Sequence, residues 1–248
     1  MARAPRRDRQ ARSNGNSTPA DSPPPPPSGS DHERIVAAFM GLLVERPIEE
    51  IERAEIAARA GVSLAVLRGE FGSVLAILAA HIKQIDLTVL NSGDADMAEE
   101  PARERLFDAL MRRIEALAPF KEAIRSLLHS LRRHPGLALA VNGLAVRSQR
   151  WMLTAAGLDS AGPEGGLRAQ GLAILFARVL RVWVDDDDPG LARTMAALDR
   201  ELARGQRWAG FLSDLCRLVP SRRLCRSRSR RRRHRDDDGH RDEEAILA

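Results

Sequence analysis

The chain has 248 residues, and its apolar residues are concentrated between two polar, Arg-rich ends. The net charge of +5 divides into +2 for residues 1–31 and +4 for residues 220–248, which leaves −1 for the middle. The two cysteines do not imply a disulfide framework. The longest apolar run, Leu172–Val184, is interrupted by Arg178 and Arg181, so we expect no membrane span.

The first apolar segment follows a Pro-rich tail over residues 1–30, whose composition cannot offset the backbone entropy of folding. Ser30 and Glu33 have the spacing of a capping box, which predicts a helix that Pro47 ends. A short second helix follows, and Gly61 supplies its C-terminal turn. Ser63 then caps a third helix.

Helical periodicity continues through the rest of the chain, and no segment has the alternation of a strand. A long helix begins after Ser73 and is followed by a polar loop over residues 91–100. Asp188 and Pro189 suit the N-cap and first position of the last helix. Further helices are predicted over residues 102–117, 121–133, 136–156, 166–183 and 189–218.

Residues 45–75 have the features of a helix-turn-helix. Ala57 is small where the second and third helices meet, and Gly61 allows the sharp turn between them. Ser63 caps the third helix, so that its N-terminal half points outward. This third helix is the one that would enter a major groove of DNA.

The chain here resembles the TetR family of transcriptional regulators. The resemblance rests on Glu55-Ile56-Ala57, on Arg59-Ala60-Gly61-Val62-Ser63, and on Leu67 and Phe71. It implies an all-α, TetR-like fold with a three-helix DNA-binding domain over residues 31–75 and a helical ligand-binding and dimerisation domain over residues 76–219. It also implies a homodimer that binds double-stranded DNA as a ligand-responsive repressor. The N-terminal segment lacks the apolar stretch of a signal peptide, so we expect the cytoplasm.

The resemblance assigns DNA contacts to the third helix and the positions around it. In the family, the position of Val74 is usually a Lys that grips phosphate, the position of Arg68 an aromatic, and the position of Glu52 a Ser or Thr. Glu70 would repel phosphate, although a carboxylate can accept from a cytosine amine. The implied DNA-binding residues are Arg53, Ser63, Leu64, Ala65, Val66, Arg68, Gly69, Glu70 and Val74.

The charge of this segment opposes DNA binding, because residues 32–79 hold five Arg against seven Glu. Two interpretations therefore stay open. The first three helices either bind DNA or form only a packed cap. Arg34, Arg53 and Arg68 remain as local cations, and the basic tails could add attraction without reading sequence.

A second resemblance lies near the C-terminus. Trp183, Thr194 and Leu198-Asp199-Arg200 are similar to a TetR-fold, ubiquinone-biosynthesis lipid-binding family. That resemblance implies the alternative function, which is binding of a hydrophobic lipid or isoprenoid without specific DNA binding. The N-terminal signature is closer to the regulators, so the lipid-binding interpretation stands second.

The middle helices supply candidate contacts for a hydrophobic ligand, with a few polar groups to orient it. These candidates are Met111, Ile114, Leu128, His129, Asn142, Leu144, Ser148, Trp151 and Met152. Ala169, Ala173 and Ala177 recur every four residues and allow close helix approach. With Leu198, Leu202, Phe211 and Leu212 they resemble a dimer interface, and the alternative is ordinary core within one chain.

Nothing in the sequence indicates catalysis, since it lacks the Gly-rich nucleotide loops and the paired Cys or His motifs that bind cofactors or metals. We expect no enzyme, no cofactor and no metal. The run Asp185–Asp188 is better explained by a helix N-terminus than by a metal site. The run Arg222–Arg235 contains nine Arg and is either a solvated tail or a sequence-blind contact with nucleic acid or anionic membrane.

Overall fold

The computed structural model describes residues 29–93, 97 and 99–218, with side chains as far as residue 205. The described residues form helices and no strand, which confirms the predicted all-α class. The two terminal tails and the side chains of Phe211 and Leu212 lie outside this description. The helices are α1 Asp31–Glu45, η1 Ile48–Glu50, α2 Arg53–Ala60, α3 Leu64–Glu70, α4 Val74–Asn91, α5 Ala102–Leu117, η3 Ala118–Phe120, α6 Lys121–Arg133, α7 Pro135–Ala155, α8 Gly162–Trp183 and α9 Ala192–Leu218.

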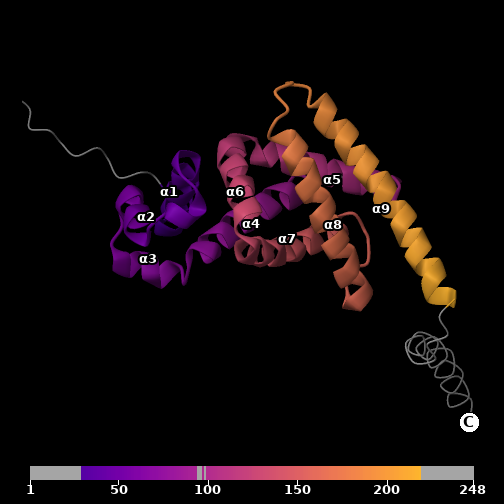
Figure 1. Cartoon of the computed structure of the whole chain (residues 1–248), viewed down its shortest axis with the longest axis horizontal. Helices are drawn as coiled ribbons and strands as arrows, with labels where there is room; N and C mark the ends of the chain where they lie inside the picture. The colour runs from indigo at the N-terminus through magenta and orange to yellow at the C-terminus, as the bar shows by residue number, and fades with distance from the viewer. Residues whose placement is uncertain (1–28, 94–96, 98, 219–248) are drawn as a thin grey trace, which may run out of the picture.

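The helices form a small unit at one end and a larger bundle beside it (Figure 1). Helices α1, α2 and α3 make the small unit, and α4 runs from it into the bundle. Helices α8 and α9 pack against each other on the far side, where a turn joins them. Helix α4 is therefore the element that both parts share.

The small unit is built on a core that also reaches into the bundle. The capping box at its start is formed, because the Glu33 N–H donates to Ser30 Oγ at 3.2 Å and the Ser30 N–H donates to Glu33 Oε2 at 3.0 Å. Ile35, Phe39 and Leu43 are fully buried on α1. Ala123 of α6 belongs to the same core, so packing continues across the predicted domain boundary.

The buried side of α4 carries an ion pair in the middle of the larger bundle. Asp86 pairs with Arg113 of α5, and Ser148 Oγ of α7 donates to Asp86 Oδ1 at 2.7 Å. The Arg113 guanidinium lies 5.5 Å from the centre of the Phe176 ring on α8. Polar side chains of α4, α5 and α7 thus form one buried cluster, and a Phe ring of α8 packs against it.

His81 lies one turn nearer the start of α4 and is also buried. Its ring meets that of Phe120 edge-on, with the ring centroids 4.4 Å apart. Burial lowers the pKa of His81 to about 4, and the charge of Arg113 acts in the same direction. The imidazole is therefore neutral near pH 7.

Helix α4 has the length and composition to span a bilayer, which the apolar runs in the sequence had not suggested. Its apolar residues Ile77, Leu78, Ile85 and Val89 are buried against the neighbouring helices. About 33% of the helix is buried inside the described structure.

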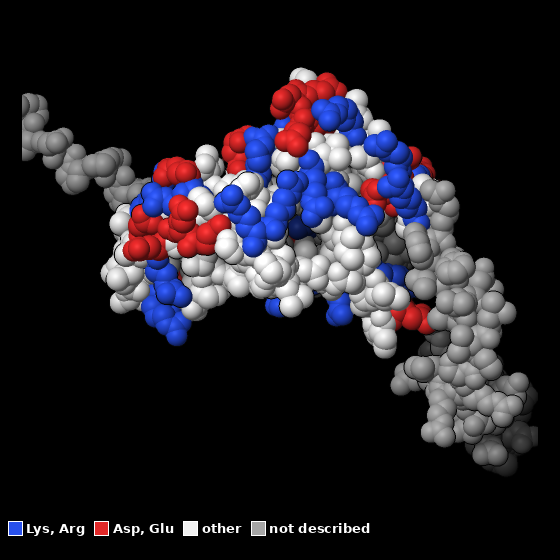
Figure 2. Space-filling model, in the orientation of Figure 1, with Lys and Arg blue, Asp and Glu red and all other residues white. Residues whose placement is uncertain are grey.

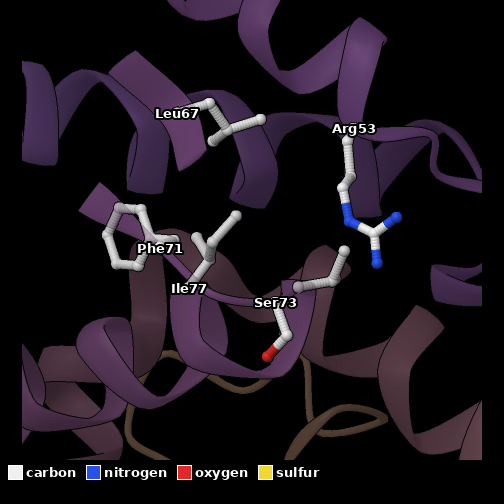
Figure 3. A pocket seen from close by; sticks show the side chains of 6 residues that line it. Arg53, Leu67, Phe71, Ser73 and Ile77 are labelled. Carbon is white, nitrogen blue, oxygen red and sulfur yellow. The ribbon is translucent and has the colours of Figure 1, made fainter. Parts of the chain in front are cut away.

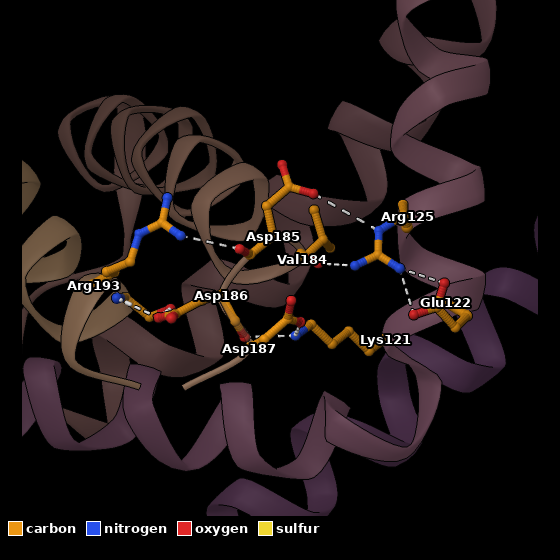
Figure 4. A network of polar contacts seen from close by, with 9 residues as sticks. Lys121, Glu122, Arg125, Val184, Asp185, Asp186, Asp187 and Arg193 are labelled. Carbon is orange, nitrogen blue, oxygen red and sulfur yellow. Dashed lines mark hydrogen bonds and ion pairs between the residues drawn. The ribbon is translucent and has the colours of Figure 1, made fainter. Parts of the chain in front are cut away.

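The acidic turn between α8 and α9 is held by cations from α6 and α9 (Figure 4). Lys121 Nζ donates to the Asp186 carbonyl at 2.6 Å, and Arg125 donates to the Val184 carbonyl. The Asp186 carboxylate accepts from the Thr194 N–H at 2.9 Å and from Thr194 Oγ1 at 2.6 Å. In the described part of the chain, no group of three or more His, Cys, Asp or Glu could hold a metal ion.

The last helix begins at Ala192, later than the predicted start at Pro189. The residue before it, Leu191, has a φ of 51°, and this left-handed conformation interrupts the helical path. Asp188 accepts from the Ala192 N–H at 3.1 Å, so it caps the helix from a position further upstream than expected.

The small residues predicted for a dimer interface lie inside the single chain. Ala169 and Ala173 are buried, as are Leu198 and Leu202 of α9. These four residues pack α8 and α9 against their own neighbours, which favours the alternative of ordinary core within one chain. Ala177 is half-buried. The large apolar residues that α8 and α9 expose to solvent are Leu167, Ile174 and Met195.

Removal of the Asp86 carboxylate should strongly destabilise the fold. The variant Asp86→Ala leaves the buried Arg113 guanidinium without its counter-charge, which costs about 3–5 kcal/mol in the free energy of unfolding. Urea unfolding followed by circular dichroism measures this. The double variant Asp86→Leu, Arg113→Met should recover most of the loss, and equal losses in the single and double variants would contradict this account.

The stability of the α8–α9 turn should fall in acid. The hydrogen bond from the Thr194 hydroxyl lowers the pKa of Asp186 below its usual value of 3.8, although burial acts in the opposite direction. The ionised carboxylate thus stabilises the fold above the unfolded-state pKa, and this contribution is lost as pH falls through the lower folded-state pKa. Urea midpoints between pH 5 and pH 3 should depend less on pH in Asp186→Asn. The exposed Asp187→Asn is the matched control.

Candidate nucleic-acid interface

The turn between α2 and α3 is set by local hydrogen bonds. Gly61 has a φ of 66°, and the Val62 N–H donates to the Ala57 carbonyl at 3.0 Å. Ser63 Oγ accepts from the Val66 N–H at 3.2 Å and caps α3. The capping residues predicted from the sequence thus have the geometry of a helix-turn-helix.

Helix α3 rests on two apolar side chains and exposes the rest. Leu67 and Phe71 are buried in the core beneath it, together with Ile56 and Ala60 of α2. Leu64, at the start of α3, is 57% exposed although it is apolar. Ser63, Ala65, Arg68, Gly69 and Glu70 are also exposed, and Val66 is half-buried. The predicted contact residues of α3 therefore share its solvent side.

Arg53 lies next to the start of α4 (Figure 3). It lines a hollow of about 10 Å³, with room for no more than a water molecule, together with Val74 and Ser73. Leu67, Phe71 and Ile77 form the apolar part of the same hollow, and the Arg53 guanidinium extends from α2 toward Ser73. The structure thus brings a cation beside Val74, which cannot donate to phosphate.

Most carboxylates of the small unit form ion pairs or hydrogen bonds with basic side chains. Glu45 pairs with Arg59 at 2.6 Å, and Glu55 pairs with Arg46 at 2.7 Å. Figure 2 shows acidic atoms gathered over α1 and α2, and a basic group that projects at the outer edge of α3. The net charge of −2 for the segment therefore does not describe the surface around α3.

Glu70 has a partner that the sequence did not reveal. His32 Nδ1 lies 3.2 Å from Glu70 Oε2, and the His32 ring lies 4.6 Å from that of Phe71. The two residues are 38 positions apart, so no local pattern could have paired them. His32 thereby restrains a carboxylate at the end of α3.

The remaining three of the five arginines of this unit, Arg34, Arg53 and Arg68, have different roles. Arg34 donates to the Ala60 carbonyl at 3.1 Å and pairs with Asp31 at 2.7 Å, so it holds the end of α2. Arg53 and Arg68 are exposed and make no ion pair with the described residues. These two are the cations available beside α3.

The sequence matches no family model and no curated protein. Solved structures are similar in fold. A TetR transcriptional regulator from Nitrosomonas europaea matches with a TM-score of 0.55 and 22% identity, over 71% of this chain and 97% of that chain. One from Rhodococcus sp. RHA1 matches with a TM-score of 0.52 and 19% identity, over 71% and 94%. The chain has the TetR fold.

In this TetR fold, the residues predicted to bind a ligand are dispersed. Trp151 is 54% exposed on α7, and His129 is exposed on α6. Ser148 is engaged by Asp86, and Asn142 exchanges two hydrogen bonds with Gln170, at 3.0 and 3.1 Å. Ile114 and Met152 are buried in the core, whereas Met111, Leu128 and Leu144 are half-buried.

Proposed function

We propose that this protein is a DNA-binding transcriptional regulator, a ligand-responsive repressor that acts as a homodimer in the cytoplasm. The observation that supports it most is the division of α3 into a buried side, with Leu67, and an exposed side, with Arg68 and Glu70. A helix held by its apolar side and free along its polar side fits a major groove. The TetR fold is consistent with this proposal.

The contacts follow from the chemistry of each exposed group. Arg68 can donate two hydrogen bonds to a guanine edge or bind a phosphate. Glu70, held by His32, can accept from a cytosine amine. Arg53 supplies a phosphate contact next to Val74. Arg68 and Glu70 would thus contact bases, and Arg53 would position the helix on the DNA backbone.

A second copy of the chain would complete the site. Two α3 helices related by a two-fold axis must reach half-sites about one helical turn apart, roughly 34–36 Å. The exposed apolar residues Leu167, Ile174 and Met195 support pairing through α8 and α9. A ligand that shifts α4 would change the spacing, because α4 continues directly from the DNA-binding unit.

Arg68→Ala should weaken binding to a selected operator by about 1–3 kcal/mol and relax specificity at one base pair. The operator comes from binding-site selection with the purified full chain, and fluorescence anisotropy at near-physiological salt gives the affinity. Arg147→Ala, which removes an exposed arginine on α7, is the matched control and should leave affinity unchanged.

The same selection tests the proposal itself. A palindromic site supports a dimeric regulator. Salt-labile binding to every sequence, with equal effects of Arg68→Ala and Arg147→Ala, would contradict it. An isoprenoid lipid that co-purifies with a chain lacking DNA binding would favour the lipid-binding alternative.

Arg53→Ala should weaken binding by a similar amount on every sequence, because a phosphate contact carries no base information. The slope of log affinity against log salt concentration should become shallower by about 1. Affinities on operator and random duplexes from 50 to 200 mM salt measure both effects. Arg59→Ala is the control, since Arg59 already pairs with Glu45. A loss confined to one base position would show that Arg53 reads sequence.

A further inference from the structure

A groove of about 320 Å³ lies at the joint between the DNA-binding unit and the larger bundle. Its walls come from three places: η1, the start of α4, and the turn between α6 and α7. The residues that line it are Ile48, Glu49, Val74, Leu75, His134 and Leu137. Its volume lies within the few hundred cubic ångströms typical of small-molecule sites.

The walls of the groove are apolar apart from one polar pair. Ile48, Val74, Leu75 and Leu137 give it an aliphatic lining. Glu49 Oε1 lies 3.1 Å from His134 Nε2, and both side chains remain partly open to solvent. A guest would therefore meet hydrocarbon along its length and a carboxylate at one end.

The carboxylate of Glu49 is held in its charged form. Burial raises the pKa of Glu49, but its own backbone N–H, the Ser130 hydroxyl and His134 lower the pKa by more, to below its usual value of 4.5. Glu49 is therefore an anion at neutral pH.

We propose that this groove binds an aliphatic primary amine, with the ammonium group on Glu49 and the hydrocarbon along Ile48, Leu75 and Leu137. An ammonium donates three hydrogen bonds and matches the charge of the carboxylate. An aliphatic acid would bring a second carboxylate against Glu49. Arg132 and Arg133, the arginines nearest in sequence to His134, are exposed and do not line the groove.

The position of the groove gives its occupant a route to the DNA-binding surface. Val74 lines both this groove and the hollow that Arg53 and Ser73 share beside α3. Glu49 belongs to the small unit and His134 to the bundle, so an ammonium on Glu49 competes with a link between the two parts. This regulatory consequence rests on the proposed DNA binding, whereas occupancy of the groove does not.

The test is calorimetric titration of the full chain, without DNA, with three probes of equal chain length: n-octylamine, 1-octanol and n-octanoate at pH 7. Octylamine should bind at least about tenfold more tightly than octanol, because it adds a charge-assisted hydrogen bond. Octanoate should bind more weakly than octanol. This comparison needs no variant, so it does not depend on whether a substituted chain folds.

Variants then locate the site. Glu49→Gln should lower the octylamine affinity at least about tenfold, to that of octanol. Glu50→Gln is the matched control, because Glu50 is adjacent, exposed and outside the groove. Leu137→Ser should weaken octylamine and octanol alike. Equal affinities for octylamine and octanoate, or an affinity unchanged in Glu49→Gln, would overturn the proposal.

Anisotropy on the selected operator, with and without octylamine, separates the two proposals. A change in DNA affinity that disappears in Glu49→Gln supports the regulatory consequence. Octylamine binding in a chain without operator binding would leave the groove site standing and overturn only the DNA-binding function. Operator binding without octylamine binding would overturn only the groove site.

Discussion

The arrangement of the DNA-binding unit depends on the burial of Leu67 and Phe71 beneath α3. A seven-residue helix has too few internal hydrogen bonds to be stable alone, so packing must hold it. The two side chains enter a core that α1, α4 and α6 share. This anchoring turns the opposite side of α3 to solvent. Because Leu67 and Phe71 are buried in the core, Arg68 and Glu70 are exposed to solvent.

Electrostatics around α3 follow from pairing more than from net charge. Counted by residues, the segment is acidic. In the structure, several of its carboxylates pair with arginines and histidines of the same chain. Such surface pairs contribute little to stability, about 0–1 kcal/mol each. They leave Arg53 and Arg68 as the arginines of this unit that make no ion pair with the described residues. A net charge of −2 is therefore compatible with a surface that approaches phosphate.

Helix α4 joins the two parts and is restrained at both ends of its buried side. Near its start it packs in the core of the small unit, and further along Asp86 ties it to Arg113 and Ser148. A buried pair of this kind contributes little net stability but penalises any arrangement that separates its members. The groove lies at the start of α4, next to the first of these two regions. An occupant there acts on the stretch of α4 nearest the DNA-binding unit.

The sequence by itself determined the features that depend on neighbours a few residues apart. Ser30, Ser63 and Gly61 predicted helix ends that the structure contains, because caps and left-handed turns are local. The all-α class followed from periodicity, and the outward-pointing third helix followed from the turn at Gly61 and the cap at Ser63. The start of α9 was missed because the left-handed Leu191 carries no local signal.

Only the tertiary structure decided which distant residues meet. It paired His32 with Glu70 and Glu49 with His134, which are 38 and 85 positions apart. It placed Ala169 and Ala173 inside the chain, and it set Arg53 beside Val74. A periodic pattern shows which side of a helix is apolar but not what covers it, because that depends on how the helices pack. The charge pairs and the groove at the joint likewise depend on how the helices pack.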